Sequence, residues 1–181
     1  MKRLLIPVVV LLLLLLTGGP AVAQSSLDAV KALMKLEGRI ETGLNYKEYS
    51  LSLADAKVET TLFLESREAR QQQALADQLR KIIDHYDTAR QIWKMKVTKI
   101  EDFGTAFGHL ISLQKGPEGD LGRLLLQKYP QANKSVEKDG ALTMGAYGSR
   151  GANEILVDHM ISIIWKEAAK ELKEAIHMVL K

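Results

Sequence analysis

The strongest constraint on the fold is a row of seven apolar residues whose spacing matches an α-helix. They advance along the chain by three or four positions at every step, and they are Leu75, Leu79, Ile82, Tyr86, Ala89, Trp93 and Val97. Charged and amide side chains fill many of the positions between them. Residues three and four apart lie on the same face of an α-helix, so this row forms one apolar stripe. The sequence therefore predicts a long helix over residues 71–97 that packs against other helices.

Two more segments, one near each end of the chain, show the same periodicity. Apolar residues recur at helical spacing over residues 27–42 and again over residues 153–180. Gly43 follows the first of these segments directly, and glycine commonly ends a helix. The sequence therefore predicts a helix in each segment.

A fourth helix is predicted to begin just after the first one ends. Asn45 is followed three positions later by Glu48, which is a capping-box pattern. The helix is expected to cover residues 46–65. Within it, residues 58–64 also suit a β-strand, but the sequence offers no partner strand, so we interpret the whole segment as helical.

The region between the third and last helices has no sustained period. Residues 103–111 and 121–129 each suggest a short helix, although glycines weaken the first and Pro130 ends the second. Glycine is frequent from residue 131 to residue 152, and we predict a long loop there. The fold class is therefore all-α: an antiparallel four-helix bundle with one or two extra short helices and a long glycine-containing loop, the irregular region spanning 98–152.

The first 23 residues are typical of a secretory signal peptide. Lys2 and Arg3 precede an apolar run of 13 residues, Leu4–Leu16, and a Gly-Gly-Pro patch then leads to the small residues Ala21–Ala23. A membrane-spanning helix needs about 20 apolar residues, so an uncleaved anchor is the less favoured alternative. We expect cleavage after Ala23, which leaves residues 24–181 as a single helical domain in the periplasm or outside the cell.

Composition excludes several classes of function. Two of the 25 Lys and Arg residues lie in the signal peptide, so 23 basic residues face 22 acidic ones in the mature chain. These charges are interleaved, whereas nucleic-acid-binding proteins usually cluster their basic residues, and we expect no nucleic-acid partner. The chain has no cysteine, which excludes disulfides, thiolate nucleophiles, cysteine-ligated zinc, iron–sulfur clusters and a lipid-modified N-terminal cysteine.

Two histidines are the first candidates for ligand binding. His85 and His159 each follow an aspartate and lie beside an apolar stripe. A histidine there either ligates a metal or haem, or satisfies its ring nitrogens at the edge of the core. We favour the second interpretation, and we expect neither a bound metal nor a cofactor.

Two tyrosines and one arginine are the remaining candidates for ligand binding. Tyr46 and Tyr49 either line a ligand pocket or pack their rings at the corner between two helices, and we favour packing. Arg150 lies in a glycine-rich stretch before the last helix, where backbone amides can hold an anion. That stretch lacks the Gly-Lys-Ser/Thr of a phosphate loop, so we interpret it as a connector.

The sequence contains no motif for a catalytic nucleophile, and we expect no enzymatic activity. The function that remains is a non-catalytic binding or protein-interaction role in the cell envelope, with an envelope protein or a small molecule as partner and no stable membrane anchor after cleavage. The alternative is a small-ligand-, metal- or haem-binding helical bundle that uses His85, His159 or both.

Overall fold

The computed structural model describes residues 26–103, 110–112, 117–132 and 154–180. The described residues are nearly all helical, which confirms the predicted all-α class. The described ranges contain four long helices, two shorter ones and a ladder of two three-residue strands. Within the described ranges, no helix is both long and apolar enough to cross a membrane.

The first two helices form a tight hairpin. α2 (Ser26–Thr42) ends at Gly43, whose φ of 84° lies in the left-handed region that glycine adopts without strain. α3 (Tyr46–Glu65) begins with the predicted capping box: the Asn45 side chain accepts from the Glu48 amide at 3.0 Å, and the Glu48 carboxylate accepts from the Asn45 amide at 2.9 Å. The segment that also suited a strand, residues 58–64, is helical.

A short helix and a long one follow. α4 (Arg67–Gln71) is capped by the Ser66 side chain, and α5 (Gln73–Phe103) then runs for 31 residues, a length of about 46 Å at 1.5 Å per residue. The predicted helix 71–97 therefore begins two residues later and continues six residues further. Gly104 is the first strongly helix-weakening residue after Val97, and α5 ends directly before it.

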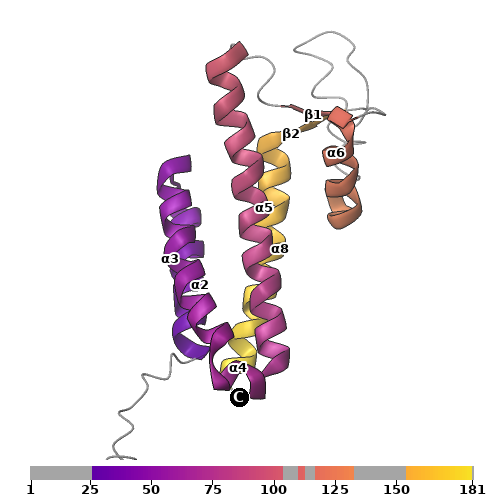
Figure 1. Cartoon of the computed structure of the whole chain (residues 1–181). Coiled ribbons are helices and arrows are strands. Elements are labelled where there is room, and N and C mark those ends of the chain that lie inside the picture. Colours follow the sequence, from indigo (N-terminus) through magenta and orange to yellow (C-terminus); the bar gives the residue numbers. More distant parts are fainter. Residues whose placement is uncertain (1–25, 104–109, 113–116, 133–153, 181) are drawn as a thin grey trace, which may run out of the picture.

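The long helices pack in a cycle of neighbours. α2 contacts α3 and α8 (Val157–Val179), and α5 likewise contacts α3 and α8. Figure 1 shows α5 and α8 side by side in opposite directions, with the α2–α3 hairpin beside their lower part. α2 begins next to α4, where the Ser26 amide donates to Glu68 at 3.3 Å. α5 extends well beyond the hairpin (Figure 1).

A small ladder of two strands lies at the end of α8 that is farther from α4 (Figure 1). β1 (Leu110–Ser112) pairs antiparallel with β2 (Glu154–Leu156), with Leu110 opposite Leu156. α6 (Pro117–Lys128) lies between them in the chain. Strands thus replace part of the short helix suggested for 103–111 and the first turn of the helix predicted for 153–180, because pairing satisfies the backbone there. The predicted loop 131–152 lies outside the described residues from position 133 onward.

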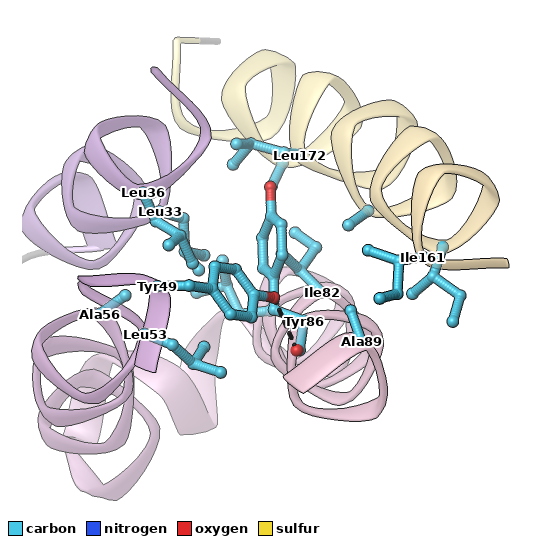
Figure 2. Packing of buried hydrophobic residues seen from close by; sticks show 14 of the residues in the cluster. Leu33, Leu36, Tyr49, Leu53, Ala56, Ile82, Tyr86, Ala89, Ile161 and Leu172 are labelled. Atoms are coloured by element: carbon cyan, nitrogen blue, oxygen red, sulfur yellow. Dashed lines mark hydrogen bonds between the residues drawn. The ribbon is translucent and has the colours of Figure 1, made fainter. Parts of the chain in front are cut away.

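The core lies where all four long helices meet. Figure 2 shows Leu33 and Leu36 of α2, Tyr49 of α3, Tyr86 of α5 and Leu172 of α8 pointing toward one another; all five are buried. The predicted stripe on α5 is buried from Leu75 to Ala89. Its last members, Trp93 and Val97, are only partly buried, since the hairpin covers only the lower part of α5 (Figure 1).

Candidate functional site

Tyr46 and Tyr49 belong to a cluster of aromatic rings contributed by three helices. The ring centroids of Tyr49, Trp93 and Trp165 lie 5.6 Å apart in every pair, and Tyr46 lies 6.0 Å from Trp93. These separations and the tilted or edge-on angles are typical of packed aromatic side chains. The structure therefore places both predicted tyrosines in one packed aromatic cluster.

The hydroxyl of Tyr49 makes two hydrogen bonds within the protein. It donates to the backbone oxygen of Tyr86 at 2.8 Å and accepts from Nε1 of Trp165 at 3.2 Å. Burial raises the pKa of the Tyr49 phenol well above its usual range, so the hydroxyl stays protonated. These bonds join α3 to α5 and α8 at one buried point.

Next to the aromatic cluster, the carboxylate of Asp87 accepts hydrogen bonds from three side chains. It accepts from Lys57 at 2.8 Å, from Gln91 at 2.9 Å and from Nε of Arg90 at 3.0 Å. Burial raises the pKa of the Asp87 carboxyl, but hydrogen bonds from Lys57, Gln91 and Arg90 outweigh it and lower the pKa to about 2. The Lys57–Asp87 pair ties α3 to α5 by charge as well as by packing.

His85 holds the end of α6 against α5. Its Nδ1 lies 2.8 Å from the hydroxyl of Tyr129, which is fully buried. The adjacent Lys128 pairs with Asp84 at 2.6 Å. Burial lowers the pKa of His85, and the charge of Lys128 lowers it further. One ring nitrogen of His85, Nδ1, is thus paired at the edge of the core.

His159 lies in the first turn of α8 and is half-buried. Its Nε2 is buried and has no hydrogen-bond partner among the described residues. The neighbouring Asp158 pairs with Lys96 of α5 at 2.7 Å. No group of three or more histidine, aspartate or glutamate side chains in the described ranges is arranged to hold a metal ion. Arg150 lies outside the described residues.

A second apolar face on α3 was missed by the sequence analysis. Leu51, Val58 and Leu62 are 59%, 57% and 47% exposed, and their spacing of seven and four positions places them on one side of the helix. We call these three residues the α3 outer stripe. Tyr49, Leu53, Ala56 and Phe63 form the buried side of the same helix. The two sides are about half a turn apart at 100° per residue, so α3 is apolar on opposite faces.

A groove with charged rims runs between α2 and α3, beside this stripe. Its volume is about 340 Å³, and Val58 of the stripe contributes to its wall. Lys35 and Arg39 line it on the α2 side, and Asp55 and Glu59 line it on the α3 side. Arg39 donates to Ser52 at 2.7 Å and so fixes the level of one helix against the other. We call this feature the α2–α3 groove.

Comparisons with protein-family profiles, with curated proteins and with solved structures found no match. The candidate site therefore rests on geometry alone. Its residues are the α3 outer stripe and the charged rims of the α2–α3 groove.

Proposed function

We propose that this chain is an exported protein with a non-catalytic, protein-interaction role in the cell envelope. Residues 1–23 direct export and are cleaved, and the mature chain folds as an antiparallel four-helix bundle. The cycle of contacts among α2, α3, α5 and α8 supports this arrangement. Interaction takes place through the α3 outer stripe and the α2–α3 groove.

The observation that carries this proposal is the exposure of three large aliphatic side chains on one face of one helix. Single exposed hydrophobic residues are common on protein surfaces, but a row of them beside polar rims is typical of an interaction site. An amphipathic helix face of this kind is commonly covered by another helix or by a complementary groove. Leu51, Val58 and Leu62 would supply the apolar centre of such a contact.

The charges around the stripe support a protein partner over a small apolar ligand. The groove is open to solvent and lined by Lys35, Arg39, Asp55 and Glu59. Ligand pockets are usually enclosed and mainly apolar, whereas a charged rim around an apolar centre is the usual composition of a protein–protein interface.

Site-specific photocrosslinking tests this proposal in cells that export the protein. A photoreactive phenylalanine analogue at Leu51 or Leu62 is expected to give a discrete crosslinked protein. The matched control is the same analogue at Leu124 of α6, which is equally exposed at 61% and lies on another helix. Equal crosslinking at all three positions, or none at any, would overturn the proposal.

Export is tested separately on the same cells. Mass spectrometry of the protein released from the envelope is expected to find a chain that begins at Gln24. A chain lacking residues 2–23 is expected to stay in the cytoplasm. Finding the intact chain in the membrane fraction would instead support the uncleaved anchor.

The alternative is a ligand-, metal- or haem-binding bundle, and the unpaired Nε2 of His159 among the described residues is the observation in its favour. A ligand at His85 would have to use Nε2, because its Nδ1 is engaged with Tyr129. Absorption spectroscopy and metal analysis of the exported protein decide the matter. A haem band, or bound metal near one equivalent, that is lost in His159→Ala would overturn the interaction proposal in favour of this alternative.

A further inference from the structure

We propose that the α3 outer stripe is covered by a second copy of this chain, in a dimer whose two-fold axis runs parallel to α2 and α3. The inference rests on the proposed interaction function and names the partner. It is carried by the distribution of charge around the α2–α3 groove, which makes this face complementary to itself.

The two rims of the groove have opposite charge. The rim on α2 is basic, because Lys35 and Arg39 line it and Lys31 lies one turn before them. The rim on α3 is acidic, because Asp55 and Glu59 line it. Opposite charges across an interface favour the correct partner and disfavour wrong ones. A face that carries both signs side by side supplies both halves of such a contact.

The direction of the two helices determines which symmetry brings opposite charges together. α2 begins beside α4 and α3 ends beside it, so the two helices are antiparallel (Figure 1). The Arg39–Ser52 hydrogen bond and the shared groove place Lys35 at about the level of Asp55 and Glu59.

A two-fold axis parallel to the helices exchanges the positions of α2 and α3 but keeps their levels. The basic rim of each copy then faces the acidic rim of the other, so the favourable contact occurs twice. An axis perpendicular to the helices, in the plane of the interface, would place α2 over α2 and α3 over α3. Like charges would then face each other, and such contacts disfavour association.

The same arrangement covers the exposed aliphatic side chains. Leu51, Val58 and Leu62 span eleven positions, or about 16 Å of helix at 1.5 Å per residue. The partner's α2 lies over them, and the methylene stems of Lys31 and Lys35 contribute apolar surface while their charges stay at the rim. The result is an apolar centre with a charged border, as in typical interfaces.

Analytical ultracentrifugation of the mature chain, residues 24–181, tests the dimer. We expect a reversible monomer–dimer equilibrium at micromolar to submillimolar concentration. Lys35→Glu and Asp55→Lys are each expected to weaken the dimer by about tenfold or more, because each change introduces two repulsive contacts. Val58→Glu is expected to give a monomer. The control is Lys166→Glu, the same charge change at an exposed position on α8, which should leave the equilibrium unchanged.

Mixing the two charge variants is the decisive step. In a mixed dimer, Glu at position 35 of one copy faces Lys at position 55 of the other, and the native Lys35 and Asp55 face each other at the second contact. An equimolar mixture of Lys35→Glu and Asp55→Lys is therefore expected to recover dimerisation that neither variant shows alone. Circular dichroism of each variant checks that the helices remain folded.

Three results would overturn this inference. They are a monomer at every concentration, a dimer that none of the three α2–α3 substitutions weakens, and variants that stay monomeric when mixed. The interaction function fails independently: it stands if the photoreactive analogue at Leu51 captures a different envelope protein, and it falls if that position captures nothing.

Discussion

Two buried tyrosines of this protein use their hydroxyls in different ways. Tyr49 both donates and accepts a hydrogen bond, to the Tyr86 backbone and from Trp165. The hydroxyl of Tyr86 is buried without a partner among the described residues, and it points toward Leu172 (Figure 2). Burial raises the pKa of both phenols. The same residue type is therefore stabilising at one position and costly at the other.

We expect the two Tyr→Phe variants to differ in stability. Tyr49→Phe should lower the free energy of unfolding by about 1–3 kcal/mol, because two hydrogen bonds are lost and Trp165 keeps an unpaired Nε1. Tyr86→Phe should leave it unchanged or raise it by up to about 1 kcal/mol, since the buried hydroxyl has no bond to lose. Urea unfolding followed by circular dichroism measures both. Equal losses in the two variants would contradict this assignment.

At the scale of elements, polar contacts join the end of α6 to α5, beside the buried side chains of Leu125 and Tyr129. His85 meets Tyr129 at one end, and Lys128 pairs with Asp84 and donates to Thr88 at 3.1 Å. Because the ring of His85 lies at this contact, the docking of α6 is expected to depend on pH.

We expect α6 to loosen as the pH falls below the ordinary histidine value of 6.5. The folded-state pKa of His85 is lowered by burial and by Lys128, so the docked form favours the neutral ring. Docking is therefore most favourable above pH 6.5. Below that pH the undocked form takes up a proton on His85 more readily than the docked form does, and docking weakens. Hydrogen exchange of residues 117–128, corrected for intrinsic rates, should be faster at pH 5.5 than at pH 7.5.

Two histidine variants make this test specific. His85→Gln should abolish the pH dependence of exchange in α6. His177→Gln, at an exposed position on α8, should leave it intact. Equal protection at both pH values in the unaltered protein would refute the role of His85.

At the scale of the whole molecule, Asp87 joins the α2–α3 hairpin to the α5–α8 pair. Its side chain is only 22% exposed and binds Lys57 of α3 as well as two donors on its own helix. The folded-state pKa of about 2 lies below the ordinary value of 3.8. The carboxylate therefore stabilises the folded state above pH 3.8, and this contribution is lost as the pH falls from 3.8 through 2.

We expect Asp87→Asn to cost about 2 kcal/mol of unfolding free energy at pH 7, as the size of the pKa shift implies. The difference from the unaltered protein should shrink as the pH approaches 2. Asp77→Asn is the control, because that carboxylate is more than half exposed and pairs with Arg80 one turn away on the same helix; such a pair contributes less than about 1 kcal/mol. Urea unfolding at several pH values measures both, and a constant difference across pH would contradict the assignment.

The local parts of the fold were predictable and the distant contacts were not. The hairpin boundaries follow from Gly43 and the Asn45–Glu48 capping box, which act within a few residues. The pairing of β1 with β2 joins Leu110 to Leu156, which are 46 positions apart. Three-residue strands carry too little pattern to be distinguished from a helix by periodicity.

The candidate site shows the same division. Val58 and Leu62 lie within the predicted helix 46–65, and at 100° per residue they fall on the side of α3 opposite Tyr49 and Leu53. A helical-wheel analysis of residues 46–65 could have separated the two faces. No sequence signal joins His85 to Tyr129, because that contact depends on where α6 docks.

The aromatic cluster also gives this protein an internal optical reporter. Both tryptophans of the chain lie in it, 5.6 Å apart between ring centroids, one on α5 and one on α8. Tyr49 of the hairpin contacts both indoles. Tryptophan fluorescence therefore reports on a single place, the point where the hairpin meets the long helix pair, and a change in it would register their separation without any added label.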